Sequence, residues 1–352
     1  MVQLWKLLLQ SPIRSCRFLY TFTVQVSLTL LRAILLPSLP RYQSLRQLLH
    51  RAYWSSSSYY FPELIHRLPV TDCAPTRARK VGADWTGYVI PGTHDLESYG
   101  VTKTAGGVPW CVVIHAHGGG YARGEARMYL NYMERWVKGA EEAGLEITFL
   151  GVEYPLTDEA PNPAQQEAFL KAYQYVLERG IPSKNVIFMG DSAGGGLCVL
   201  SGLEAIRRNL PQPAGSVLMS PWMDMSLDSF RGGNALVETD YIVGANLTVP
   251  TFTAAWLNGT PADSPLVNPL CCSAAEFQGL NPLLILVGGG EFAYQEGKDL
   301  AKLATQAGVR HHLEIEWGQM HLYALGSKWV SPAVRRKTDG MIYRWILDCL
   351  AG

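Results

Sequence analysis

Short apolar runs that alternate with helical patterns most restrict how this chain can fold. From about Trp85 onward, each run has the length of a buried strand and is bounded by Gly, Pro or polar residues. The runs are Trp110–Ile114, Ile147–Val152, Val186–Met189, Val217–Met219 and Leu283–Val287. Parallel strands need crossover helices between them. The alternation therefore predicts an α/β fold, with a mainly parallel twisted sheet and helices on both of its faces.

Other segments complete or interrupt this pattern. Two stretches each have one apolar helix face, over residues 168–176 and 341–350. Leu313, Ile315 and Trp317 alternate with glutamates, which predicts a strand with one exposed face near the sheet edge. Residues 221–268 break the alternation, and we expect them to form an insertion over the top of the sheet.

The composition excludes several classes of protein. With 30 basic and 30 acidic residues among 352, the net charge is zero, unlike the basic surface of a nucleic-acid-binding protein. Charged residues make up 17% and hydrophobic residues 48%, an apolar excess that suits a large core, an apolar cleft or a membrane-facing segment. The seven cysteines show no spacing typical of disulfide scaffolds or zinc sites. We therefore expect neither a metal nor a cofactor.

Residues 1–45 form an apolar N-terminal segment. No charge occurs from Phe18 to Leu31, Arg32 interrupts, and apolar residues continue to Leu36. A membrane-spanning helix needs about 20 mainly apolar residues, so the segment is marginal as a span. Polar residues at every second position from 21 to 29 suit an amphipathic element lying on a membrane or over a cleft. Membrane attachment is the favoured hypothesis, and a packed helix of a soluble domain and a cleaved signal are the alternatives.

The compartment follows only in part from this segment. A retained anchor would place the protein at a membrane, for which we expect the endoplasmic reticulum, and without an anchor we expect the cytoplasm. Basic residues on both sides of the segment leave the topology open. The sequons at Asn246 and Asn258 would be glycosylated only if the body of the protein were lumenal.

The pentapeptide Gly190-Asp191-Ser192-Ala193-Gly194 directly follows one predicted strand and precedes an apolar helical run. A sharp strand-to-helix turn needs small residues on both sides of the serine, and it exposes the serine hydroxyl at the carboxyl edge of the sheet. This context predicts that Ser192 is a nucleophile. A glycine-rich packing turn with an ordinary serine is the alternative.

A nucleophilic serine needs N–H donors for the negatively charged oxygen of its tetrahedral intermediate. The run His117-Gly118-Gly119-Gly120 follows the strand ending at Ile114, and glycines leave their amides unobstructed. Gly118, Gly119 and Ala193 are the predicted oxyanion hole, with Gly120 and Asp191 as supporting motif residues. We expect His117 to hold this loop in place rather than act as a base.

An acid and a base are expected after the last two strands. Glu291 follows the strand ending at Val287, and His321 lies in the loop after Trp317. In this prediction His321 accepts the Ser192 proton and Glu291 orients the imidazole. Carboxylates further along the next helix and histidines flanking the last strand have weaker claims, and these are Glu296, Asp299, His311 and His312.

Three motifs occur in an order typical of one family: the HGGG run, GDSAGG at Gly190–Gly195, and the stretch from Glu153 to Ala164. From about Trp110 to Tyr323 the chain resembles the hormone-sensitive-lipase-like branch of the α/β-hydrolases. Most members carry Asp-Pro-Leu-Arg-Asp-Glu-Gly where this chain has Glu291-Phe-Ala-Tyr-Gln-Glu-Gly297, so the resemblance implies a glutamate as the acid. A looser resemblance is to fungal steryl acetyl hydrolases.

The resemblance implies a hydrolase domain over residues 46–352, with a cap built from about 46–70 and 221–268. Tyr121, Trp222 and Trp256 would then line the substrate pocket, with plain core packing as the alternative. The implied function is a serine carboxylesterase or deacetylase acting on small hydrophobic esters, without a metal or cofactor. Acyl transfer to an alcohol or amine on the same triad is one alternative. A binding protein that has lost catalysis is a weaker one, because His321 is retained.

Overall fold

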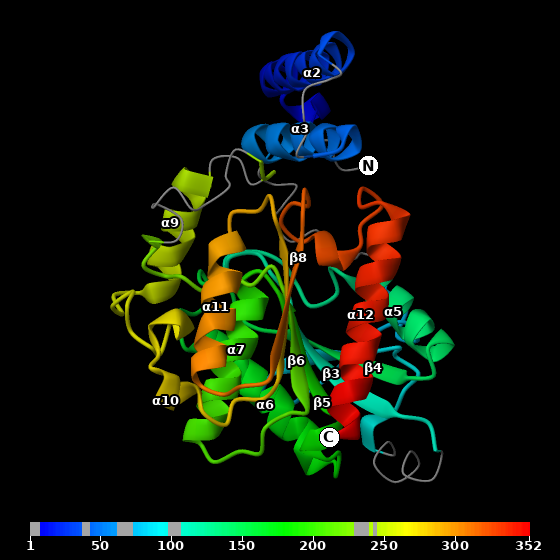
Figure 1. Cartoon of the computed structure of the whole chain (residues 1–352), viewed down its shortest axis with the longest axis vertical. Coiled ribbons are helices and arrows are strands. Elements are labelled where there is room, and N and C mark those ends of the chain that lie inside the picture. The colour runs from blue at the N-terminus through cyan, green and yellow to red at the C-terminus, as the bar shows by residue number, and fades with distance from the viewer. Residues whose placement is uncertain (1–7, 37–42, 62–72, 98–106, 229–238, 242–244) are drawn as a thin grey trace.

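A single eight-stranded sheet organises the protein (Figure 1). The computed structural model describes residues 8–36, 43–61, 73–97, 107–228, 239–241 and 245–352. The strands have the sheet order β1-β2-β4-β3-β5-β6-β7-β8. Their bounds are β1 Arg79–Val81, β2 Thr86–Ile90, β3 Trp110–Ala116, β4 Glu146–Glu153, β5 Val186–Asp191, β6 Gly215–Met219, β7 Leu283–Gly288 and β8 His311–Glu316. From β4 to β8 every neighbouring pair is parallel, so the carboxyl ends of these strands meet at one edge.

Helices cover both faces of this sheet (Figure 1). Their bounds are α5 Leu130–Glu142, α6 Ala164–Glu178, α7 Ala193–Arg207, α9 Ala245–Leu257, α10 Ala274–Phe277, α11 Tyr294–Gln306 and α12 Pro332–Ala351. Alternate strand residues point to opposite faces. Val112 and Ile114 therefore share a core with α6, α7 and α11, whereas Cys111 and Val113 share one with α5 and α12.

The predicted fold class is confirmed, since all five predicted buried strands are present in a mainly parallel sheet. The sequence pattern did not reveal β1 and β2, which pair antiparallel at one edge. At the other edge, β8 is less open than predicted. Glu314 and Glu316 are half-buried because Lys337 of α12 donates to both at 2.6 Å.

The N-terminal residues form two stacked helices, α2 (Pro12–Leu35) and α3 (Leu45–Tyr60), beyond the carboxyl edge of the sheet (Figure 1). Helix α3 begins at a capping box made by Ser44 and Gln47. Helix α2 packs on it through Phe18, which contacts Phe61 edge-on. The described residues contain one helix long and apolar enough to cross a membrane, α2, and only 6% of its most apolar window is buried.

The predicted cap regions are described only in part. Residues 62–70, 229–238 and 242–244, as well as residues 1–7 and 37–42 of the N-terminal segment, lie outside the described residues. Within the insertion, residues 221–228, 239–241 and 245–268 are described, and the last of these ranges includes α9. Asn258 is exposed just after α9, whereas the side chain of Asn246 is not described.

Candidate active site

Ser192 lies at a sharp turn between β5 and α7. Its φ of 50° and ψ of −122° are rare for a residue with a side chain, and such strain is typical of functional turns. The turn is tight enough to exclude side chains at its flanks. A Cβ at Gly190 would lie 2.3 Å from the Gly194 carbonyl oxygen, and one at Gly194 would lie 2.1 Å from that of Ala116. This is the conformation that presents a serine hydroxyl at the carboxyl edge of the sheet.

The HGGG loop follows β3 and lies against this turn. A Cβ at Gly118 would be 3.0 Å from the Ser192 Cβ. Two groups hold the loop: the Tyr154 hydroxyl donates to the His117 carbonyl at 2.5 Å, and the Tyr154 ring stacks on the His117 imidazole at 4.2 Å. The His117 Nδ1–H donates to the Gly118 carbonyl at 2.8 Å. His117 is therefore in contact with the loop backbone.

The N–H of Gly118, predicted as an oxyanion donor, is already bonded. It donates to Asp191 Oδ1 at 3.0 Å, and the Tyr129 hydroxyl donates to the other oxygen of that carboxylate at 2.8 Å. Burial raises the pKa of Asp191 to about 7, against the effect of these bonds and of His321. The Gly118 amide thus fixes the loop to the serine turn and is not available to a substrate.

The next amides of the loop differ from that of Gly118. Within the described part of the chain, the N–H groups of Gly119, Gly120 and Ala193 have no hydrogen-bond acceptor. Ala193 is the first residue of α7, where helix geometry leaves the amide without an intrahelical partner. Gly120 is only half-buried and has a φ of 62°.

Glu291 and His321 lie together at the same edge, after β7 and β8. Both are buried, at 0% and 4% exposure, and Glu291 Oε2 lies 3.7 Å from His321 Nδ1. This separation is an ion-pair contact, slightly longer than a hydrogen bond, as is common in sites without substrate. The Ser220 hydroxyl donates to Glu291 Oε2 at 2.6 Å and accepts the Leu322 N–H at 3.0 Å, which links the two loops.

The pKa of His321 reflects opposing effects. Burial alone would lower it, but Glu291, followed by Asp240 and Asp191, favours the imidazolium and raises the pKa above its usual value of 6.5. A raised pKa makes the unprotonated imidazole a stronger proton acceptor, which suits a general base oriented by a carboxylate.

The four groups with weaker claims are engaged elsewhere. Glu296 accepts the N–H groups of Met223 and Asp224, and Asp299 accepts from Gln295. His311 bonds the Val309 carbonyl, and exposed His312 lies 3.7 Å from Glu314. None of these contacts involves Ser192 or His321.

The three aromatic residues predicted to line a pocket are buried against one another. Tyr121 stacks on Trp256 at 4.4 Å between ring centroids and lies 6.0 Å from Trp222. Their exposed fractions are 0%, 0% and 3% for Tyr121, Trp256 and Trp222. Because these faces are covered by neighbouring rings, the three residues form core in this structure, and the packing alternative describes them better.

Several residues that support the site were missed by sequence reasoning. They are Tyr129, Tyr154, Ser220 and Asp240. Tyr154 lay within a quoted motif, but its hydroxyl role depends on a contact 37 residues away. The others have no motif of their own, since each acts on main-chain groups or carboxylates of distant loops.

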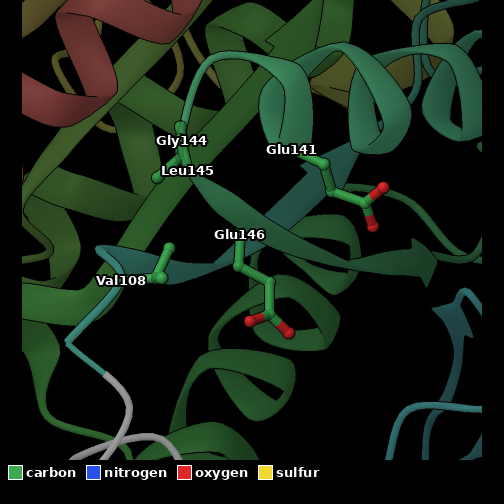
Figure 2. Close-up of a pocket in the computed structure, with 5 residues that line it drawn as sticks. All are labelled: Val108, Glu141, Gly144, Leu145 and Glu146. Carbon is green, nitrogen blue, oxygen red and sulfur yellow. The ribbon is translucent and has the colours of Figure 1, made fainter.

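A pocket elsewhere in the molecule is unrelated to this chemistry. Figure 2 shows it, lined by Val108, Glu141, Gly144, Leu145 and Glu146. It lies where β3 and β4 begin, whereas Ser192 follows the carboxyl end of β5. Over the described ranges, no cluster of three or more His, Cys, Asp or Glu side chains could hold a metal ion.

Comparisons with known proteins agree with this architecture. Residues 113–325 match a family model described as alpha/beta hydrolase fold. An acetyl-hydrolase of Streptomyces hygroscopicus is 32% identical over 209 residues, which cover 59% of this chain and 66% of that protein, just under two thirds. An esterase of Acinetobacter venetianus is 26% identical over 240 residues, covering 67% and 75%. A solved esterase from the bacterial hormone-sensitive lipase family is 25% identical with a TM-score of 0.66, covering 94% and 98%.

A match over more than half of the chain, together with the sheet and the serine turn, defines the class: this chain belongs to the α/β-hydrolase family. Within that family its relatives place it in the hormone-sensitive-lipase-like branch, whose named members here are ester hydrolases. The family resemblance inferred from the sequence motifs is thereby confirmed.

Proposed function

We propose that this protein is a serine carboxylic ester hydrolase with Ser192, His321 and Glu291 as its catalytic triad. The observation that carries the proposal is the convergence of the strained Ser192 turn and the buried Glu291–His321 pair at one edge of the sheet. The names of the relatives, acetyl-hydrolase and esterase, support the same reaction class.

Acylation begins when His321 Nε2 takes the Ser192 hydroxyl proton and Oγ bonds to the ester carbonyl carbon. The carbonyl electron pair moves to its oxygen and forms the oxyanion. When the intermediate collapses, the carbon–alkoxy bond breaks and the alkoxide leaves with the proton from His321. Water then repeats these steps on the acyl-enzyme, which releases the acid and restores Ser192. Glu291 stabilises the imidazolium in both halves.

The oxyanion donors we propose are the amides of Gly119, Gly120 and Ala193. Gly119 and Ala193 were expected from the sequence, and Gly120 replaces Gly118, whose N–H is bonded to Asp191. Each such donor contributes about 3–4 kcal/mol to the transition state in comparable enzymes. Gly118 instead fixes the loop to the serine turn and so holds the neighbouring amides in place.

We further propose short acyl groups on lipophilic alcohols as the substrate class. The support is the acetyl-hydrolase relative and the apolar α2 surface that lies beyond the catalytic edge. Steryl acetates fit this class and follow the looser resemblance of the sequence.

Replacing Ser192 with Ala tests the function. Wild type should hydrolyse p-nitrophenyl acetate and react with a fluorophosphonate probe, whereas Ser192→Ala should lose both, with turnover reduced by about 10⁴-fold or more. Ser201→Ala, a buried serine on α7 away from the turn, is the matched control and should retain activity. Turnover by Ser192→Ala at the wild-type rate would exclude the proposal.

We also propose that α2 attaches the protein to a membrane. One face of its C-terminal half carries Leu28, Leu31 and Leu35, which are 62%, 50% and 69% exposed. With 24 residues the helix is long enough to cross or lie in a bilayer. Its side chains mostly face outward, which argues against a packed helix of the soluble domain.

Vesicle binding tests this attachment. Wild-type protein should sediment with phosphatidylcholine vesicles, and a Leu28→Glu, Leu31→Glu, Leu35→Glu variant should stay in the supernatant. The control carries three glutamates at exposed apolar positions outside α2, namely Val108, Met128 and Leu266, and should bind as wild type. Equal binding of the α2 variant and the control would contradict a role for α2.

A further inference from the structure

A short piece of the insertion, Thr239–Tyr241, lies between the two loops that carry Glu291 and His321. We name it the clasp segment. Its central residue, Asp240, is fully buried. Asp240 Oδ2 accepts the N–H of Phe292, the residue after Glu291, at 3.0 Å. Oδ1 accepts the N–H of His321 itself at 3.2 Å. One carboxylate therefore bridges the main chain of the loop that carries Glu291 and the main chain of the loop that carries His321.

The residues beside Asp240 extend this bridge. The Thr239 hydroxyl donates to the carbonyl of Gly290, the residue before Glu291, at 2.8 Å. The Tyr241 N–H donates to Asp240 Oδ1 at 2.7 Å, and the Tyr241 ring lies 6.4 Å from the His321 ring. Glu291 is thus held from both sides by groups of the clasp segment.

The clasp segment is itself held from outside by the N-terminal region. Gln43 Nε2 donates to the Thr239 carbonyl at 2.7 Å, and Arg51 Nε of α3 donates to the Asp240 carbonyl at 3.0 Å. Gln47 of α3 also donates to the Gly318 carbonyl, three residues before His321, at 2.8 Å. Helix α3 therefore bonds to the clasp segment and to the loop that carries His321, in both cases at main-chain carbonyls.

We propose that Asp240 is a positioning residue that sets the distance between Glu291 and His321, and that α3 keeps it in place. This inference rests on the proposed function. A buried carboxylate with three main-chain N–H donors is well satisfied, whereas its removal leaves buried donors unpaired in both catalytic loops. Misplacement of a catalytic group by about 1 Å can cost 10²-fold in rate.

Asp240 also acts on His321 through its charge. The charged and titratable groups around the imidazole are Glu291, Asp240, Asp191 and Tyr241. Burial raises the pKa of Asp240 to about 6, so its carboxylate is charged at neutral pH and favours the imidazolium. Removal of this charge should lower the pKa of His321. Activity needs neutral His321, so kcat/KM falls at acid pH as His321 becomes protonated. This acid limb of the pH profile should then move to lower pH.

Asp240→Asn is the decisive variant, because the amide keeps the shape of the carboxylate but its nitrogen cannot accept a hydrogen bond. We expect kcat on p-nitrophenyl acetate to fall 10- to 100-fold with little change in KM, and the acid limb to move to lower pH. Asp263→Asn, an exposed carboxylate of the same insertion, should match wild type in all three. An Asp240→Asn enzyme with the kcat and pH profile of Asp263→Asn would overturn the proposal.

Two further measurements keep the test decisive. Nuclear magnetic resonance titration of the His321 ring, assigned with His321→Gln, should show a lower pKa in Asp240→Asn whether or not any ester is turned over. An unchanged pKa there would refute the role of Asp240, whereas absence of turnover and probe labelling in wild type would refute only the proposed function. If Asp240→Asn does not fold, Thr239→Val replaces it, and a kcat equal to wild type would refute the clasp.

Discussion

The two halves of the site differ in where their supports come from. The half with Ser192 and the HGGG loop is held by Asp191, Tyr129 and Tyr154, which lie on or next to the sheet. The half with Glu291 and His321 has one support at the sheet, Ser220 directly after β6, and is otherwise held by the clasp segment and by α3, outside the sheet. The first half is therefore part of the central core, whereas the second depends in addition on the insertion and the N-terminal helices.

This difference indicates how the site can vary. Groups fixed by the buried sheet change little when the surface changes. Groups held by an insertion change position when the contacts that hold the insertion change. If α2 rests on a membrane, α3 connects it to the acid–histidine half of the catalytic machinery.

The largest effect should come from removing the charge that orients the base. Glu291→Gln should lower kcat by about 10³- to 10⁴-fold, since the amide cannot stabilise the imidazolium. Steady-state rates on p-nitrophenyl acetate measure this. Asp299→Asn, on α11 and bonded to Gln295, is the control and should retain the wild-type kcat. If Asp299→Asn were the inactive variant, the acid would have to be reassigned.

A smaller effect should separate the two halves. Tyr154→Phe keeps the stack on His117 but removes the bond to its carbonyl, so the free energy of unfolding should fall by about 1 kcal/mol. We expect kcat to fall a few-fold because the oxyanion donors loosen, with the acid limb of the pH profile unmoved. The unchanged acid limb would distinguish Tyr154→Phe, which alters the Ser192 half, from Asp240→Asn, which alters the other half.

Tyr173→Phe is the matched control for this variant. The Tyr173 hydroxyl also donates to a carbonyl, that of Pro211, at 2.6 Å, but far from the serine turn. It should lose similar stability and keep full activity. Equal kcat values for Tyr154→Phe and Tyr173→Phe would show that the HGGG loop does not need its tyrosine.

The same division explains how far the sequence could predict the molecule. Ser192 and its glycines lie within one local motif, Gly190–Gly195, and Glu291 and His321 follow recognisable strands. Asp240 gives no such signal, because its partners are main-chain N–H groups 52 and 81 residues away. The occupied Gly118 amide and the mutual burial of Tyr121 and Trp256 are packing results that no spacing encodes.

The smallest effect concerns how α3 is held as the pH changes. His50 of α3 stacks on Trp329 at 4.9 Å and lies 6.0 Å from the Tyr241 ring, so it joins α3 to the clasp segment. Burial, followed by the positive charge of Arg46, lowers the pKa of His50 to about 4. Between pH 6.5 and 4 the unfolded chain therefore binds a proton at His50 that the folded protein does not. The stability contributed by neutral His50 is complete above pH 6.5 and is lost as the pH falls to about 4.

His50→Phe retains an aromatic stack without a titrating group. Compared with wild type, its apparent Tm should be relatively higher at pH 4.5 than at pH 7.5, because only the wild-type protein loses the His50 contribution. His312→Gln, at an exposed histidine of β8, should follow the wild-type pH dependence and so removes general acid effects from the comparison. Parallel pH dependences for wild type and His50→Phe would mean that α3 is held independently of His50.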